Sequence, residues 1–377
     1  LQSWQVGSPQ SFDYDAEPKK QGTYHLGGGL QLESLYPVVE GYKDSFALGG
    51  RVDLSDPLRL NHASLSVSFS PDQSLPMNER THVNVEYRRY DWEARAAWND
   101  ADFYDLFGPT KTSRKGYFVS LARTDTLIYD EPKRLTSRIE GRFSGNLDQL
   151  PEYQNIQVDV DKLFSIEAEL NYSFVKSSLG HVDDEKGRKA SLVFESDRVN
   201  GPYFARFHGT YDEGFSLPIG HSSIWIRSAA GFSPHDPDEP FANFYFGAFG
   251  NNYVDHLEEK RYREYYSFPG KAINTVAGRN FARSMVEWNL PPVRFSRAGT
   301  PGAYLSWMRP AVFVGGLVTN MDRELIRRRA TTAGGQIDFR FTILSALDMT
   351  FSAGAAIAFE PGVAARREAM ISLRVLK

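Results

Sequence analysis

Residues 163–174 read LFSIEAELNYSF, and this stretch predicts the fold class of the whole chain. Apolar side chains alternate with polar ones along it. One face carries Phe164, Ile166, Ala168, Leu170, Tyr172 and Phe174, and the other carries Ser165, Glu167, Glu169, Asn171 and Ser173. Because successive side chains of a β-strand point to opposite faces, the pattern predicts a strand with one apolar and one wet face. The run is about twice as long as a typical soluble strand.

The same alternation recurs along most of the chain. ASLSVSFS at 63–70 and QIDFRFTI at 336–343 each set polar residues against apolar ones. Convincing helical patterns are missing. Strands are predicted near 22–32, 45–54, 62–70, 81–90, 91–99, 115–124, 134–144, 163–175, 188–197, 202–211, 222–232, 281–290, 303–318, 334–344, 347–359 and 368–376.

These strands predict an all-β fold, and more narrowly a transmembrane antiparallel β-barrel of about sixteen strands. Most are long enough to cross a bilayer when tilted, and closure satisfies every backbone group in lipid. A water-filled lumen accommodates alternating charges such as Arg138, Glu140 and Arg142. Trp92 and Trp98 suit the aromatic belt at the membrane surface. The alternative is a soluble β-sandwich, propeller or large β-repeat protein, whose strands also alternate.

Composition and motifs narrow the function classes. The net charge of −4 gives no electrostatic case for nucleic acid, and the absence of cysteine excludes disulfides and thiolate metal sites. No nucleophile elbow, phosphate-binding loop or zinc-protease motif occurs in the sequence. We therefore expect no enzymatic activity, no cofactor and no bound metal.

Domain boundaries follow from where the alternation begins and where it is interrupted. Residues 1–21 are expected to form an N-terminal connector, and residues 22–377 the barrel. Residues 233–280 are too long for a turn and rich in aromatics and glycine, so they predict a long sixth extracellular loop that folds back into the lumen. Residues 176–187 break the rule that periplasmic turns are short.

A family resemblance appears in the order of the C-terminal motifs. They are FGAFGNN at 246–252, VAGRNFARSMVEWNLPP at 276–292, VFVGGLVTN at 312–320, AGGQIDFRFTIL at 333–344, LDMTFSAGAAIAFE at 347–360 and EAMISLRVLK at 368–377. This part resembles the bacterial surface antigen superfamily, the outer-membrane assembly factors with a sixteen-stranded barrel. FYDLFGPTKTSRKGY at 103–117 and DEPKRL at 130–135 look similar to a subgroup whose barrel follows a soluble β-propeller.

The resemblance implies a location and a function. The chain is expected in the outer membrane of a Gram-negative bacterium, in contact with the lipid bilayer and lipopolysaccharide. It is then the membrane part of a larger protein that inserts or exports a client polypeptide or lipid. A passive porin or receptor, or an anchor for an upstream periplasmic domain, is the alternative. No nucleic acid partner is expected.

The resemblance also implies a latch inside the barrel. In the family, an Arg-Gly-aromatic tip of the sixth loop docks in the lumen, whereas this sequence has RYREYY at 261–266. We predict that Arg261 or Arg263 pairs with Glu287, which alternation turns toward the lumen. A solvated carboxylate without a fixed partner is the alternative. Gly316 fits a family glycine on the next strand, but Val314 takes the place of the family's acidic residue.

A weak seam between the first and last strands is the other implication. Gly27, Gly28 and Gly29 carry no side chain to pack and so weaken the expected first strand, and Ile371 and Leu373 lie on the last. A tight packing site or a bulge at these glycines is the alternative.

Overall fold

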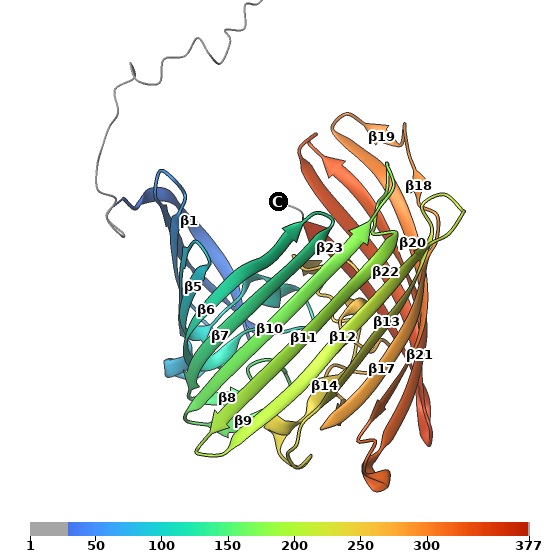
Figure 1. Cartoon of the computed structure of the whole chain (residues 1–377). Helices are drawn as coiled ribbons and strands as arrows, with labels where there is room; N and C mark the ends of the chain where they lie inside the picture. Colours follow the sequence, from blue (N-terminus) through green and yellow to red (C-terminus); the bar gives the residue numbers. More distant parts are fainter. Residues whose placement is uncertain (1–28, 376–377) are drawn as a thin grey trace, which may run out of the picture.

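The computed structural model describes residues 29–375, and its regular elements are β-strands and short 3-10 helices (Figure 1). No helix in this part of the chain is long and apolar enough to cross a membrane. The strands are β1 Gln31–Tyr42, β2 Ser45–Ser55, β3 Asn61–Phe69, β4 Thr81–Arg89, β5 Trp92–Asp100, β6 Arg114–Asp130, β7 Lys133–Gly145, β8 Leu147–Gln149, β9 Gln157–Val160, β10 Leu163–Lys176, β11 Lys186–Val199, β12 Tyr203–Ser216, β13 Ser223–Phe232, β14 Phe244–Phe246, β15 Val254–Asp255, β16 Val276–Gly278, β17 Asn280–Asn289, β18 Val293–Arg294, β19 Gly299–Thr300, β20 Ala303–Thr319, β21 Arg328–Ile343, β22 Leu347–Glu360 and β23 Val363–Val375. The 3-10 helices are η2 Met77–Glu79, η3 Phe103–Phe107, η4 Pro240–Ala242, η5 Arg261–Arg263 and η6 Glu324–Ile326. The predicted all-β class is confirmed.

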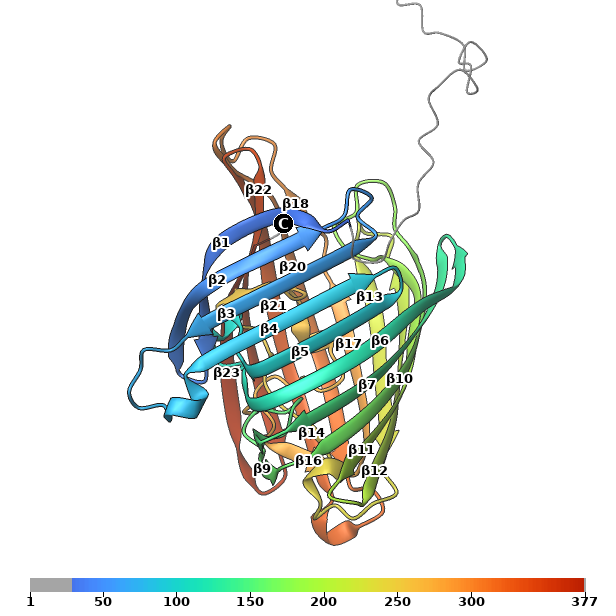
Figure 2. The ribbon, with the colours of Figure 1, turned by 90° about the vertical axis from the view of Figure 1, so that its left-hand side faces the viewer.

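One large sheet dominates the molecule. It contains nineteen strands, of which β15, β18 and β19 have only two residues each. The long strands pair antiparallel with their neighbours in the chain and curl around an interior, here called the lumen (Figures 1 and 2). Within residues 29–375, β1 and β23 share no ladder pairing, so the sheet is open at this seam. The expected closure is therefore not seen, and other segments hydrogen-bond to both edges.

Strand order defines two rims of the sheet. β1 begins and β23 ends at the terminal rim, and residues 233–279 leave and re-enter the sheet at the opposite rim, the loop rim. The hairpin 177–185 lies at the terminal rim, since β10 and β11 are neighbouring antiparallel strands.

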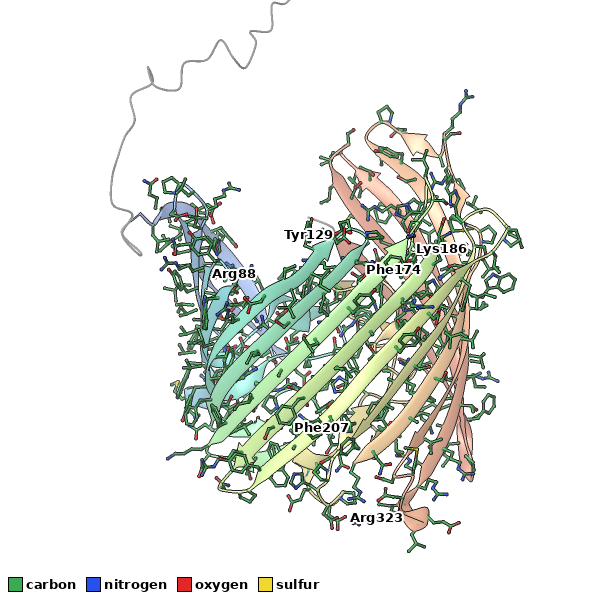
Figure 3. All side chains as sticks on the ribbon, in the orientation of Figure 1. Arg88, Tyr129, Phe174, Lys186, Phe207 and Arg323 are labelled. Atoms are coloured by element: carbon green, nitrogen blue, oxygen red, sulfur yellow. The ribbon has the colours of Figure 1, made fainter. Side chains whose placement is uncertain are left out.

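Burial is inverted relative to a soluble protein. On β3, Leu65, Val67 and Phe69 are 42%, 44% and 48% exposed, whereas the serines between them are buried. Figure 3 shows the side chains on the sheet, and the labelled Phe207 of β12 belongs to the same exposed apolar set. A soluble domain rarely exposes a large contiguous apolar surface. The outward wall of this sheet is therefore suited to an apolar surrounding, and the inward face of β3 is polar.

Residues 233–279 fold inside the sheet. Phe244, Phe246 and Phe268 of this segment are almost completely buried and form one apolar cluster with Phe281 of β17 and Leu317 of β20. Packing of this kind orders a long connection that contains only short strands and single helical turns. The segment is a folded structure inside the curled sheet.

The start of the sheet differs from the prediction. A first strand was expected at 22–32, but β1 runs from Gln31 to Tyr42, and Gly29 precedes it. Gly27 and Gly28 lie outside the described residues, as does the expected connector 1–21. This strand was missed in the sequence because a register shift between Leu32 and Ser34 breaks the alternation of apolar and polar residues.

Candidate functional site

Glu287 lies on the inward face of β17 and is completely buried. Alternation places it there, because its neighbours Val286 and Trp288 take the outward positions. Arg263 of the long loop donates to its carboxylate through Nη2 at 2.7 Å and Nε at 3.1 Å. Arg227 of β13 donates from Nε at 2.7 Å, and the hydroxyl of Tyr262 donates at 2.8 Å. Glu287 is therefore held by the loop and by the neighbouring strand.

The ion pairs extend beyond Glu287. Nη2 of Arg263 lies 2.7 Å from Oδ2 of Asp183, which belongs to the hairpin 177–185. Nη1 of Arg309 lies 3.2 Å from Asp183, and its Nη2 lies 3.0 Å from Asp338. We call this set the luminal ion cluster: Asp183, Arg227, Lys260, Arg263, Glu287, Arg309 and Asp338. It joins the loop to four elements of the sheet.

Lys260 shows how far the loop reaches. Its Nζ lies 3.7 Å from Glu287, 3.3 Å from Asp183 and 2.5 Å from the side-chain oxygen of Asn289. Asn289 is the last residue of β17, so the loop crosses the lumen from the loop rim almost to the terminal rim. The cluster therefore sits near the end of the lumen at which β1 begins and β23 ends.

Burial and charge act against each other in this cluster. Burial alone would raise the pKa of the Asp183 carboxyl, but Arg263, Lys260 and Arg309 hold that pKa well below its ordinary value. Burial, together with repulsion from Arg309 and Arg263, lowers the pKa of Lys260 to about 8, although Asp183 and Glu287 oppose this. Lys260 thus loses its proton at a lower pH than an exposed lysine does, while its side chain stays in the cluster.

The predicted latch residues have different positions. Arg263 contacts Glu287, but Arg261 does not: its Nη1 lies 3.4 Å from Asp255 and its Nη2 lies 3.4 Å from the Tyr266 hydroxyl. The tight turn of η5 directs the two arginines to different partners. Of the two arginines that the prediction named, Arg263 is therefore the one that contacts Glu287, and the latch role of the Arg263–Glu287 pair stays a prediction.

Gly316 is not part of the cluster. It pairs with Ser284 of β17 and Thr331 of β21, and it shares the outward face with Val314. A Cβ at Gly316 would meet only the Ala330 carbonyl oxygen, at 3.9 Å. Alternation explains the correction, because luminal positions of β20 are those of Phe313 and Leu317.

Sequence patterns had partly signalled the other members of the cluster. Asp338 belongs to the predicted polar face of 336–343, and Asp183 lies on the connection that was too long for its side of the barrel. That hairpin carries the Asp183 carboxylate to the cations of the cluster. Arg309 had no sequence signal, since its partner Asp183 lies far away in the chain.

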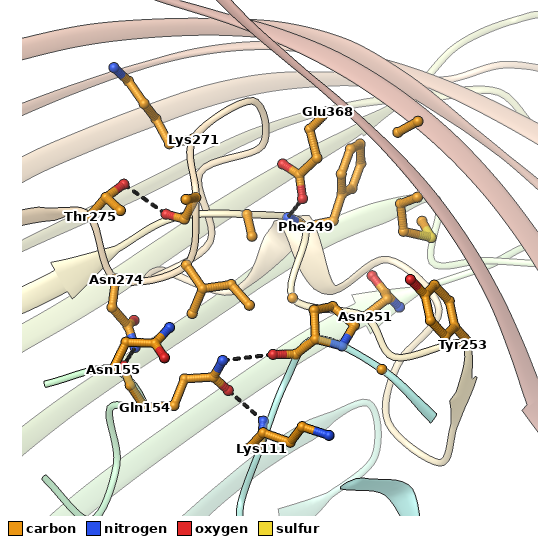
Figure 4. Close-up of a pocket in the computed structure, with 18 of the residues that line it drawn as sticks. Lys111, Gln154, Asn155, Phe249, Asn251, Tyr253, Lys271, Asn274, Thr275 and Glu368 are labelled. Atoms are coloured by element: carbon orange, nitrogen blue, oxygen red, sulfur yellow. Dashed lines mark hydrogen bonds between the residues drawn. The ribbon is translucent and has the colours of Figure 1, made fainter. Parts of the chain in front are cut away.

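A polar cavity of about 890 Å³ lies beside the seam (Figure 4). The β1–β2 turn, residues 108–113, the long loop and β23 line it. Glu368 of β23 accepts hydrogen bonds from the backbone N–H groups of Phe249 at 3.1 Å and Gly270 at 2.7 Å. Across the cavity, the backbone N–H of Lys111 donates to the side chain of Gln154. A second cavity, of about 780 Å³, lies between the loop and the β10–β13 wall.

The seam candidates on β23 contact the loop. The backbone N–H of Leu373 donates to the Tyr253 carbonyl at 2.8 Å, and β15 pairs in parallel with Leu373 and Arg374. Ile371 is exposed on the outward face. Gly29 lies near Asp56 and Pro57 rather than on β1. Within residues 29–375, no group of three or more histidine and carboxylate side chains is placed to hold a metal ion.

Comparisons with known proteins were made for the sequence and for the fold. No protein-family model matches the sequence, and no curated protein matches it. Solved structures that align with this chain include CdiB from Escherichia coli, with a TM-score of 0.47 and 13% identity over 94% of this chain and 63% of that one. CdiB from Acinetobacter baumannii aligns with a TM-score of 0.47 and 13% identity over 92% of this chain and 59% of that one. This chain thus spans less than two-thirds of either structure.

Proposed function

We propose that this chain is a transmembrane β-barrel of sixteen strands in a bacterial outer membrane. The inverted burial carries this proposal: large apolar side chains such as Val67 and Val314 are exposed on the outward wall, and charged ones such as Glu287 are buried inside. A lipid-facing barrel needs this distribution, and water on both faces would penalise it. The length of strands such as β10 and β21 also suits a tilted span.

We infer further that the barrel moves a polypeptide across or into that membrane. A loop that fills the lumen and is held by the side chains of the luminal ion cluster, with only the two residues of β15 in a ladder with the sheet, supports this function. Residues 233–279 lie between two cavities. The luminal ion cluster holds the part of this loop that reaches farthest across the lumen, at Lys260 and Arg263. Side-chain contacts rearrange more readily than a sheet ladder, so an extended chain passes when the loop shifts. The proposal assigns the protein no catalytic activity.

Contact with lipopolysaccharide is part of the same proposal. The β20–β21 turn at the loop rim carries exposed Arg323 (Figure 3) and half-buried Arg327, and Arg329 is exposed at the start of β21. Cationic side chains near a membrane surface attract anionic lipid headgroups. This rim therefore suits the leaflet that carries lipopolysaccharide.

Reconstitution tests the function. We expect the chain to need detergent or lipid, to migrate differently in electrophoresis before and after heating, and to give small, fluctuating conductance in planar bilayers. Depletion from its host is expected to deplete specific secreted or membrane-inserted polypeptides. Solubility in plain buffer with one fixed mobility contradicts the barrel. A wide, steady conductance contradicts polypeptide transport and favours the passive pore.

A further inference from the structure

Two luminal segments bridge the seam between β1 and β23. The first, residues 102–110, pairs with β1: the backbone N–H of Gly41 donates to the Asp102 carbonyl at 2.8 Å, and the reverse bond is 3.1 Å long. The second, residues 252–256, pairs with β23 through β15. Each segment occupies ladder positions at one free edge. Along the rest of β1 and β23, within the described residues, these outer edges have no ladder partner.

The two segments are joined to each other at Asn252. Its side-chain oxygen accepts from the backbone N–H of Thr110 at 2.8 Å, and its amide donates to the carbonyls of Tyr104 and Thr110 at 3.2 Å each. The backbone N–H of the next residue, Tyr253, donates to the Phe107 carbonyl at 2.7 Å. A single buried amide therefore makes most of the polar contacts of this joint.

Packing around the joint is equally close. A Cβ at Gly108 would lie only 2.8 Å from the Asn252 Cα, so no larger residue fits without moving the joint. The rings of Tyr104 and His256 stack with centroids 4.1 Å apart. The contacts form an unbroken path from Gly41 on β1 to Leu373 on β23.

We propose that residues 102–110 and 252–256 form a releasable strap that holds β1 and β23 apart. β1 runs from the terminal rim to the loop rim and β23 runs back, so direct pairing between them is antiparallel, as elsewhere in the sheet. The strap occupies both edges instead. Release at Asn252 frees the edges, and unpaired backbone groups at membrane depth are costly, so β1 and β23 then pair and close the seam. The strap itself is defined by the contacts described above. Only the free-energy gain from pairing β1 with β23 rests on the proposed membrane location.

The test uses the cysteine-free chain. Val39→Cys on β1 is combined with Ala365→Cys, Ala369→Cys or Ile371→Cys on β23, and disulfide yield is measured in lipid with and without Asn252→Ala. Loss of four side-chain hydrogen bonds, including the one that the Thr110 hydroxyl donates to Asn252, should raise the yield in one register by roughly tenfold or more. Asn251→Ala is the matched control, because Asn251 is equally buried but donates to the Glu259 carbonyl within the same loop.

A second variant reaches the same joint from the other segment. Gly108→Ala keeps the Asn252 amide but forces the segments apart, so it should raise the same cross-link. Heat-modifiable mobility shows for each variant that the sheet has folded. The strap is overturned if neither Asn252→Ala nor Gly108→Ala changes the disulfide yield of any cysteine pair in folded protein. Failure of the protein to enter lipid instead contradicts the proposed function, and the two failures are therefore distinguishable.

Discussion

Glu287 and its surroundings decide how the long loop is held. Its buried carboxylate meets Arg227 of the wall and Arg263 and Lys260 of the loop. Taking a charge out of water is costly unless partners and hydrogen bonds replace the water, and here they do. Undocking the loop would leave the Glu287 carboxylate buried without two of its cations. The free-energy cost of that unpaired charge stabilises the docked loop more than any single hydrogen bond does.

Neutralising this carboxylate should release the loop. In Glu287→Gln the side chain keeps its shape, but three cations lose their counter-charge, and breaking a buried pair costs about 3–5 kcal/mol. Ser267→Cys reports the change, because Ser267 is completely buried inside the docked loop. We expect its maleimide labelling to accelerate in Glu287→Gln. Gly316→Ala, on the outward wall, is the control and should leave the rate unchanged. An unchanged rate in Glu287→Gln contradicts the latch.

Lys260 gives the docked loop a pH dependence. Its pKa is about 8 in the folded protein against 10.5 in water, so docking releases a proton between these values. Docking therefore strengthens as pH rises from about 8 to 10.5, by at most roughly 3 kcal/mol. Labelling of Ser267→Cys, corrected with an exposed cysteine at Leu325, should slow over this window. Lys260→Met should abolish the change of labelling rate with pH. If the change persists in this variant, another titrating group causes it.

At the scale of elements, alternation connects sequence to environment. β17 in VEWNLPPVRF turns Glu287 inward and Trp288 outward, and the strand ends at Asn289 before two prolines that cannot donate to a ladder. Pairing with β20 resumes at β18. The prolines thus terminate one strand without detaching the chain from its neighbour.

The outward wall of β20 allows a direct test of its surroundings. Val314 is 56% exposed, so arginine there would cost little if the wall faced water. In lipid, arginine near the middle of the wall costs about 2–4 kcal/mol. We expect Val314→Arg to lower the free energy of unfolding in vesicles by that amount, measured by urea titration. Leu325→Arg, in the fully exposed turn η6, is the control. Equal stability of the two variants contradicts a lipid-facing wall.

At the scale of the whole molecule, the loop lies between two cavities of about 890 and 780 Å³. Replacing residues 240–275 with a short glycine-serine linker should join them into one passage. We expect single-channel conductance to rise markedly and become steady. A variant with the loop intact and Glu324→Gln at the rim should keep the original conductance. Unchanged conductance after loop removal contradicts the assignment of the loop as the luminal barrier.

Several parts of the site were predictable from sequence. The luminal orientation of Glu287, the folding of residues 233–279 and the polar face that includes Asp338 all follow from local patterns. The choice of Arg263 over Arg261 did not, because both lie within the single turn η5 and only the docked geometry separates them. Asp183 lies 80 residues from its arginine partner, and no spacing rule reports such a contact.

The sequence by itself determined most of the strands, β1 excepted, and which face their side chains take, because the two-residue period of a strand is a local property of the backbone. It also determined that the wall is apolar outside and polar inside. Only the tertiary structure decided which cations meet Glu287, where the sheet stays open and which segments bridge Gly41 to Leu373. These contacts depend on how the sheet curls and how the loop crosses the lumen, and that path is set by the packing of distant residues.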